Sequence, residues 1–243
     1  MKKILVPTLM AAAMGSLTSV AHAAEPESTL AFNAGVVSEY RYRGISQSRL
    51  QPALQGGVGY TDKSGFYVGA WGSTIKWIKD AGGDANVELD LYGGYKGAVG
   101  DVAYDVGFLR YEYPSNKLPV SANTNEVYGA VTYGPFTAKY SHAISNLFGY
   151  ADSKNSYYLD LSATFDLGDG YSLVPHVGYQ KVKNTAPDAS YTDYALTLGK
   201  DLGNGFSATA AVLGTNADKA VYYTPSSKFT GKTAVVVGLK YSF

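Results

Sequence analysis

The residues best suited to chemistry in this sequence are charged side chains that recur at every second position within otherwise apolar segments. Facing lipid, each would cost roughly 2–4 kcal/mol near the bilayer midplane, so their restriction to one face predicts a polar barrel interior. The candidates for lining that interior are Glu39, Arg41, Arg43, Glu88, Asp90, Asp105, Arg110, Glu112 and Lys139. The same alternation adds Gln55, Lys96, Glu126, Asp160, Asp166, Gln180, Asp193 and Lys240.

Two interpretations of the inward arginines remain open. Arg41, Arg43 and Arg110 could form a constriction that attracts anions or a substrate. Alternatively, they could pair with Glu39, Glu112 and Asp90 and plug the interior as a structural network. Small residues on the inward set favour some open space: Gly35, Gly56, Ala103, Gly107, Ser162, Ser172, Gly178 and Ser207.

The histidines give little support for catalysis or metal binding. His142 has serines one residue before and three after it, and neither shares its face of a strand. The sequence fixes no serine or carboxylate beside His176. Zinc sites need three or four clustered ligands, and the chain contains no cysteine. The sequence therefore predicts no enzymatic activity, no cofactor and no metal site.

The amino-terminal segment predicts export. It reads MKKILVPTLMAAAMGSLTSVAHA, with basic Lys2 and Lys3, an apolar stretch from Ile4 to Val20, and a small-residue site at 21–23. The apolar stretch contains Pro7 and polar residues and has no stop-transfer flank, which argues against a membrane anchor. We expect a Sec signal peptide, residues 1–23, and a mature barrel, residues 24–243.

Composition narrows the class of protein. The chain has 20 basic and 20 acidic residues, so loss of Lys2 and Lys3 leaves 18 against 20, a net charge near −2. A nucleic-acid partner would need a basic surface. Gly (28) and Tyr (22) are abundant, yet no apolar run beyond the signal reaches the ~20 residues of a membrane helix. A membrane β-barrel and an exported β-sandwich both fit, so the pattern along the chain must distinguish them.

The carboxyl-terminal segment has the pattern of a strand that closes a membrane barrel. Residues 233–243 read TAVVVGLKYSF, with apolar residues at odd positions and mostly small or polar residues between them. Lipid-facing apolar residues that end in aromatics at the headgroup level are typical of such strands. We expect Leu239, Tyr241 and Phe243 to act as the recognition signal for barrel assembly.

The rest of the chain supplies eleven more alternating segments. The phase switches between Phe108 and Leu109 in the fifth, which predicts a β-bulge. The twelve predicted strands are 30–43, 53–61, 66–74, 86–96, 102–113, 125–133, 136–145, 156–167, 171–183, 191–200, 206–214 and 233–243.

Connection lengths alternate strictly. After even-numbered strands the connections are tight and rich in Gly, Asn, Asp and Pro, as hairpin turns require. After odd-numbered strands they are longer. Short periplasmic turns, long outer loops and an even strand number are typical of outer-membrane barrels, and aromatic residues at the strand ends predict two girdles. The predicted fold is an all-β, transmembrane, antiparallel up-and-down β-barrel of about twelve strands.

Three motifs near the amino terminus carry a family resemblance. They are S-x-Y-R-x-R-G-I-S-Q from Ser38, P-A-x-Q-G-G from Pro52 and S-G-F-Y-x-G-x-W-G-S from Ser64. Over Val37 to Ser73 the chain resembles the TorF-type porin family of proteobacterial outer membranes. The resemblance implies a porin-like β-barrel but no particular solute. The first motif either folds a loop over the barrel mouth or serves as a folding signature.

Two functions follow as hypotheses. The first is an outer-membrane porin-like channel for passive diffusion of small hydrophilic solutes or ions. The second is a closed structural or adhesive barrel that acts through its outer loops, notably Ala217 to Lys232 with Tyr222, Tyr223 and Phe229. Expected partners are outer-membrane lipid, lipopolysaccharide, the barrel assembly machinery and small solutes, with no nucleic acid; the sequence leaves the oligomeric state open.

Overall fold

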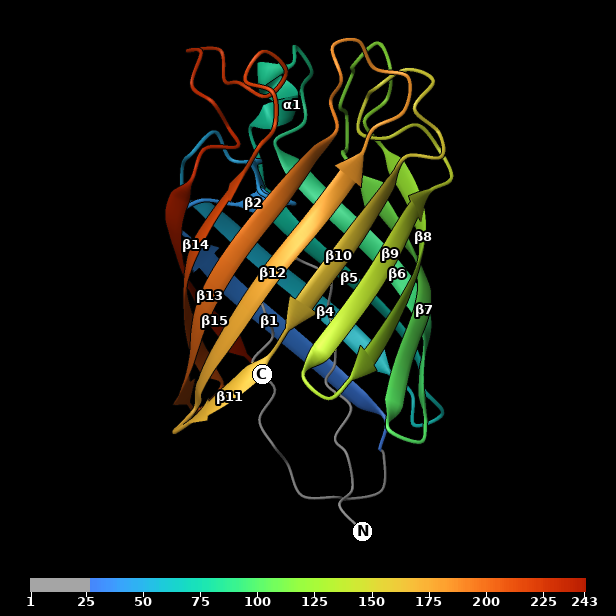
Figure 1. The fold of residues 1–243 in the computed structure, drawn as a ribbon, viewed down its shortest axis with the longest axis vertical. Helices are drawn as coiled ribbons and strands as arrows, with labels where there is room; N and C mark the ends of the chain where they lie inside the picture. Colours follow the sequence, from blue (N-terminus) through green and yellow to red (C-terminus); the bar gives the residue numbers. More distant parts are fainter. Residues whose placement is uncertain (1–26) are drawn as a thin grey trace.

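The computed structural model describes residues 27–243, which form a closed antiparallel β-barrel of twelve strands (Figure 1). The predicted signal peptide lies outside the described residues. No helix between residues 27 and 243 is long and apolar enough to cross a membrane.

Each barrel strand pairs with its sequence neighbours, and β10 and β11 form one strand interrupted at Thr164. The strands are β1 (Thr29–Val37), β4 (Ala53–Thr61), β5 (Phe66–Thr74), β6 (Val87–Val99), β7 (Val102–Glu112), β8 (Thr124–Tyr133), β9 (Phe136–Ala143), β10 (Tyr157–Ala163) with β11 (Phe165–Gly168), β12 (Tyr171–Lys181), β13 (Tyr191–Gly203), β14 (Phe206–Thr215) and β15 (Ala234–Ser242).

The first and last strands close the barrel. β1 pairs antiparallel with β15, from Asn33 opposite Ser242 to Val37 opposite Gly238. Phe32 and Phe243 extend this ladder, because each donates its backbone N–H to the other's carbonyl, at 2.8 and 3.0 Å. Their rings stack with centroids 5.7 Å apart. The predicted closing strand is therefore in place, and its final residue contacts the first strand.

Turns and loops separate to opposite ends of the barrel (Figure 1). Short turns occupy 62–65, 100–101, 134–135, 169–170 and 204–205, and long loops occupy 38–52, 75–86, 113–123, 144–156, 182–190 and 216–233. At the last short turn, Asn204 and Gly205 have φ of 50° and 82°. A two-residue hairpin turn of this kind requires positive φ at both positions, which Asn and Gly tolerate best. The predicted alternation of connection length is confirmed.

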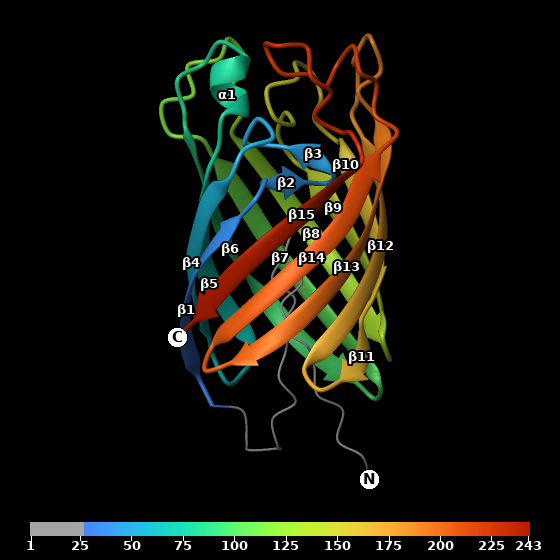
Figure 2. The ribbon, with the colours of Figure 1, turned by 90° about the vertical axis from the view of Figure 1, so that its left-hand side faces the viewer.

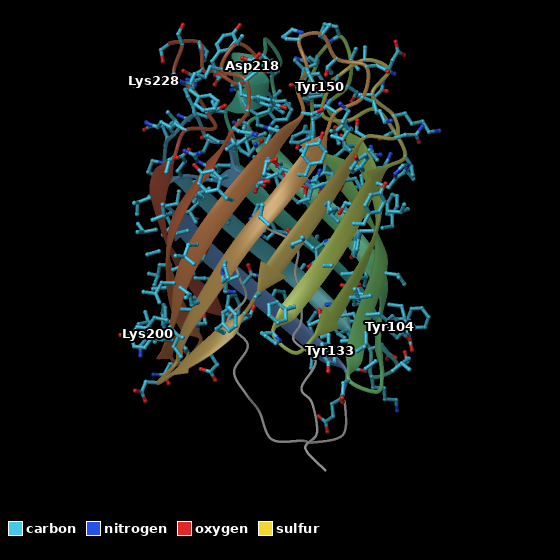
Figure 3. The ribbon with its side chains drawn as sticks, viewed as in Figure 1. Tyr104, Tyr133, Tyr150, Lys200, Asp218 and Lys228 are labelled. Atoms are coloured by element: carbon cyan, nitrogen blue, oxygen red, sulfur yellow. The ribbon has the colours of Figure 1, made fainter. Side chains whose placement is uncertain are left out.

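The outer surface of the wall is apolar. In β15, the outward Val235, Val237 and Leu239 are 66%, 50% and 44% exposed, whereas the inward Val236 is 7% exposed. Aromatic side chains mark the short-turn end, as Tyr104 and Tyr133 show in Figure 3. An outward apolar band bordered by aromatic side chains is typical of a barrel wall that contacts lipid, so the pattern fits a membrane-spanning wall.

The first predicted strand is shorter than expected. β1 ends at Val37, and the chain then turns inward as a small hairpin of β2 (Arg41–Tyr42) and β3 (Ile45–Ser46) that lies within the barrel (Figure 2). Its turn residues, Arg43 and Gly44, have φ of 46° and 77°. Positive φ at two consecutive residues reverses the chain tightly, so the segment 38–43 does not continue along the wall.

The predicted bulge in the fifth strand is wrong. β7 pairs without interruption with both β6 and β8, so alternation continues through Phe108 and Leu109. Leu109 faces inward and is 4% exposed, because it packs against the apolar side chains around the inner hairpin. The wall is interrupted instead at Thr164, within the segment predicted as one strand from 156 to 167, and its register shifts beside two short turns, at 166–168 and 201–203.

The uninterrupted register changes the positions of Arg110 and Glu112. Arg110 stands opposite Leu91, an outward residue that is 43% exposed, so both arginine and glutamate face outward. Arg110 donates from Nε to Glu112 Oε2 at 2.8 Å, near the long-loop end of β7. The expectation that these two residues line the interior is therefore wrong, and their charges are paired on the outer surface.

Candidate functional site

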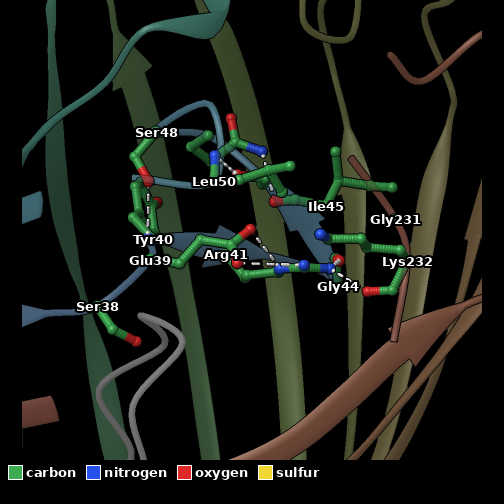
Figure 4. A network of polar contacts seen from close by, with 12 residues as sticks. Ser38, Glu39, Tyr40, Arg41, Gly44, Ile45, Ser48, Leu50, Gly231 and Lys232 are labelled. Carbon is green, nitrogen blue, oxygen red and sulfur yellow. Dashed lines mark hydrogen bonds and ion pairs between the residues drawn. The ribbon is translucent and has the colours of Figure 1, made fainter. Parts of the chain in front are cut away.

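The inner hairpin, defined as residues 38–52 with β2 and β3 at its centre, is the candidate functional site. Gln47 donates its N–H to Tyr40 O at 2.8 Å, and Tyr40 donates its N–H to Ser48 Oγ at 3.0 Å (Figure 4). Ser46 donates its N–H to Thr230 O, at 3.0 Å, in the loop before β15. These bonds fix the hairpin internally and join it to an outer loop.

Arg41 holds the base of the inner hairpin. Its Nε donates to Glu39 Oε1 at 2.7 Å, and one terminal nitrogen donates to Gly44 O at 2.9 Å and Lys232 O at 2.8 Å (Figure 4). Arg41 and Glu39 are 4% and 8% exposed. The guanidinium therefore connects both arms of the hairpin to the segment that leads into β15.

Arg43 connects the hairpin to strands on the opposite side of the barrel. It donates to both carboxylate oxygens of Glu126 on β8, at 3.0 and 2.7 Å, and to Gln180 Oε1 on β12, at 2.6 Å. Its guanidinium carbon also lies 4.3 Å from the ring centroid of Tyr158 on β10. A two-point arginine–carboxylate pair of this kind fixes orientation as well as charge. The hairpin thus reaches from β1 to the opposite wall.

The tip of the hairpin presses against β13 and β14. A Cβ added at Gly44 would lie 2.7 Å from Asp193 Cβ and 3.4 Å from Gly214 O, and φ at Gly44 is +77°. Only glycine meets both the close approach and the backbone conformation.

Tyrosines surround the other side of the hairpin. Tyr42 and Tyr111 share a hydroxyl–hydroxyl bond, and Tyr111 donates to Glu126 Oε2 at 3.1 Å. Tyr40 donates to Glu88 Oε1 at 3.0 Å and packs edge-on against Trp71 with centroids 5.5 Å apart. The hairpin is therefore embedded in aromatic rings as well as in charges.

The interior at the level of the hairpin is narrow. Arg43, Glu88, Asp90 and Glu126 are 8%, 1%, 4% and 1% exposed. Charged side chains that lined a wide aqueous pore would be accessible to water. The charged groups that the sequence places inward are thus gathered into a constriction.

Asp105 on β7 and Lys139 on β9 form a second group of buried charged side chains. Tyr67 donates to Asp105 Oδ1 at 2.5 Å and shares a hydroxyl–hydroxyl bond with Tyr128. The ammonium of Lys139 lies 4.0 Å from the Tyr128 ring centroid, a cation–π contact. Both Asp105 and Lys139 belong to the predicted interior set and are buried.

Inward glycines make room for these tyrosine rings. A Cβ at Gly107 would lie 2.6 Å from Tyr128 Cζ, and one at Gly94 would lie 2.7 Å from Tyr67 Cζ. The same holds at Gly178, where a Cβ would lie 2.8 Å from Asp193 Oδ1 and still nearer Tyr158. Each ring therefore lies flat over a glycine of a neighbouring strand instead of extending across the lumen.

The opposite wall is lined by small side chains. From β13 through β14, β15, β1 and β4, alternation turns small residues inward: Thr197, Gly199, Thr209, Ala211, Gly238, Gly35, Gly57 and Gly59. These residues are much smaller than the aromatic residues that β5 to β8 turn inward, so the two walls fill the barrel unequally.

His176 has neighbours that sequence analysis missed. Its Nε2 lies 3.2 Å from Asp160 Oδ2 and 3.1 Å from the Tyr158 hydroxyl, and its Nδ1 lies 3.6 Å from Asp193 Oδ2. These partners come from β10 and β13, on either side of β12, so only the strand register reveals them. His142 lies on the outer face, 3.2 Å from Asn155 Oδ1. Among residues 27–243, no three or more His, Cys, Asp or Glu side chains are arranged to hold a metal ion.

Charged pairs also join the outer loops. Lys117 Nζ lies 2.9 Å from Asp84 Oδ2, and this hydrogen bond holds the pKa of the Asp84 carboxyl below its usual range. Both groups are exposed, so the pair contributes little to stability. The loops are nonetheless connected to one another above the hairpin.

The structure places most of the predicted site residues together. Glu39, Arg41 and Arg43 come from the hairpin, whereas Glu88, Asp90, Asp105 and Lys139 come from β6, β7 and β9. Arg110 and Glu112 lie outside this group. At the carboxyl terminus, Leu239, Tyr241 and Phe243 all face outward at the barrel seam, and Tyr241 stacks on Phe243 with centroids 5.3 Å apart.

Comparison with known proteins identifies a family and a fold. The family model described as "Bacterial protein of unknown function (Gcw_chp)" matches residues 21–243. No curated protein matches the chain. Among solved structures, the KdgM porin is 11% identical with a TM-score of 0.55, covering 89% of this chain and 99% of that chain. The NanC porin is 11% identical with a TM-score of 0.54, covering 88% and 99%. A further KdgM structure, in complex with disordered oligogalacturonate, is 10% identical with a TM-score of 0.55, covering 89% and 99%. At these identities the likeness shows a shared barrel fold.

Proposed function

The chain belongs to the Gcw_chp family of bacterial proteins, and we propose that it is a porin-like channel of the outer membrane. Small hydrophilic solutes or ions would diffuse through it passively, without energy coupling, cofactor or catalysis. We also propose that the amino-terminal signal peptide directs export of the chain in a Gram-negative bacterium. Outer-membrane lipid and lipopolysaccharide would surround the apolar wall.

The observation that carries this proposal is a charged hairpin that crosses a polar lumen. Arg43 extends from the first outer loop to Glu126 and Gln180, so the loop narrows the lumen at one level. Beside it, the wall from β13 to β4 carries mostly small inward residues. A narrow, charged passage of this design selects by size and by charge.

Two comparisons support the same class of protein. The barrels of the KdgM and NanC porins share the fold. The three motifs between Ser38 and Ser73 resemble the TorF-type porin family, and the structure gives the first of them a position: it forms the inner hairpin. We propose that this motif builds the constriction.

A second candidate function is a closed barrel that acts through its outer loops. The low exposure of Arg41, Arg43 and Glu88 favours it, because these side chains fill the lumen at the level of the hairpin. Loop 216–233 would then present a partner-binding surface, with Tyr223 55% exposed.

Single-channel current of the refolded mature protein in a planar bilayer distinguishes the two functions. For the channel, we expect steady but small conductance, and under a salt gradient a reversal potential that indicates cation preference. The preference follows from the charges at the level of the hairpin. There Arg41 and Arg43 are each paired with a carboxylate, whereas Glu88 and Asp90 have no ion-pair partner in the described part of the chain. Silence from protein shown to be folded would contradict the channel and leave the loop-presenting barrel.

We also propose that the barrel assembly machinery recognises the carboxyl-terminal residues. Deletion of Phe243 should reduce the amount of folded barrel in the outer membrane, because Phe243 pairs with Phe32 across the seam and is 64% exposed to an assembly partner. The measurement is heat-modifiable mobility of membrane fractions, with Phe243→Tyr as the control that keeps the aromatic ring. Normal assembly of the deletion variant would refute the role.

A further inference from the structure

We propose that Glu88 and Asp90 bind a monovalent inorganic cation, sodium or potassium, beside the inner hairpin. The two carboxylates come from alternate positions of β6, so both project to the interior, with backbones ~7 Å apart. Carboxylates at this spacing can approach one ion between them. The proposed ion site does not depend on the channel function, and it would be present even if the barrel conducted no current.

The first argument is that both carboxyl groups contain a buried oxygen without a hydrogen-bond partner. Among residues 27–243 the buried side-chain polar atoms without such a partner are Glu88 Oε2, Asp90 Oδ1 and Trp77 Nε1. Glu88 and Asp90 are 1% and 4% exposed. A buried carboxylate oxygen without a donor is costly, and native structures rarely retain one. A cation would compensate both oxygens.

The second argument is charge. Glu39 and Glu126 are paired with Arg41 and Arg43, whereas none of the ion pairs within the described residues includes Glu88 or Asp90. Arg43 is the basic group whose charge acts on Asp90, and its guanidinium is already bonded to Glu126. Both carboxyl groups thus lack an ion-pair partner in a buried setting, where an unpaired ionised carboxylate is most unfavourable.

The surroundings define what kind of ion fits. Tyr40 donates to Glu88 Oε1 at 3.0 Å, so one carboxylate is held in place while its other oxygen stays available. Trp77 packs edge-on against Tyr113, with centroids 5.2 Å apart, in the same buried cluster as Tyr40. The indole N–H of Trp77 has no acceptor among the described residues.

The small number of ligands argues against a tightly bound ion. Structural zinc sites use four side-chain ligands, and calcium takes six to eight oxygen ligands. No three such side chains are arranged for a metal within the described chain, and this site offers two carboxylates. Two carboxylate ligands therefore fit a weakly bound monovalent cation.

The two tryptophans of the chain provide the readout. Trp71 packs against Tyr40 and Trp77 against Tyr113, and both of these tyrosines are hydrogen-bonded to Glu88. We expect sodium or potassium, but not choline at equal ionic strength, to change tryptophan emission of the folded protein in detergent saturably. The same ions should raise Tm by about 2–4 °C.

Variants at the pair and a matched control complete the test. Glu88→Gln and Asp90→Asn should each abolish the difference between sodium and choline. Asp105→Asn, which removes another buried carboxylate, one that accepts a hydrogen bond from Tyr67, should retain it. Emission and Tm of the unaltered protein that do not depend on cation identity would overturn the proposal and indicate a protonated pair. Equal responses at micromolar calcium would overturn the monovalent assignment.

Discussion

Replacing Tyr40–Gln47 with eight glycine and serine residues should increase single-channel conductance several-fold while the barrel still folds. The wall strands pair with one another independently of this segment, because β1 ends at Val37 and β4 begins at Ala53. Without the hairpin, the lumen loses Arg41 and Arg43 together with their contacts to Lys232, Glu126 and Gln180. The narrowest level would then be set by the wall alone.

The matched control replaces an outer segment that does not enter the lumen. Lys183–Asp188, in the loop before β13, is largely exposed and carries no contact to the hairpin that the structure shows. Its replacement by glycine and serine should leave conductance unchanged. If the hairpin variant folds and conducts no better than the parent, the hairpin does not form the constriction.

Breaking the Arg43–Glu126 pair should have the largest effect on stability. Removing one partner of a buried ion pair leaves the other charge uncompensated, at a cost of about 3–5 kcal/mol. Arg43 and Glu126 are 8% and 1% exposed. We expect both Arg43→Gln and Glu126→Gln to lower the free energy of unfolding by this amount in urea titrations of the folded barrel.

The double variant tests whether Arg43 and Glu126 stabilise the protein through their mutual contact or independently of each other. Arg43→Gln with Glu126→Gln should cost clearly less than the sum of the single variants, since no unpaired charge remains. Arg110→Gln serves as control, because the Arg110–Glu112 pair lies on the outer surface, 39% and 27% exposed, and should cost about 1 kcal/mol or less. Additive losses at Arg43 and Glu126 would contradict direct coupling.

Most of the wall could be predicted from sequence because its signals are local. The strands 53–61 and 66–74 match β4 and β5 residue for residue. The alternation of apolar and polar residues indicates which face of a strand contacts lipid, and Gly, Asn and Asp indicate the turns. At Arg43-Gly44 the local signal was ambiguous, because Arg41 and Arg43 continue the alternation of β1 although the chain has already left the wall.

The site was less predictable because its contacts cross the lumen. Alternation places Glu126 and Gln180 inward, but their common partner, Arg43, is 83 and 137 residues away in sequence. The inward position of Leu109 was unpredictable for a related reason: an apolar residue inside a polar barrel is explained only by the hairpin cluster that packs against it. The neighbours of His176 likewise depend on the registers of β10 and β13.

The anchoring of the inner hairpin has a consequence for the order of folding. Its partners lie on β8 and β12 and at Lys232, which immediately precedes the last strand. Contacts of such long sequence separation form late, because the intervening chain must be ordered first. The first outer loop therefore seats only after nearly the whole wall exists. A newly closed barrel passes through a stage in which its lumen is wider than in the finished protein, and seating of the loop is the step that ends it.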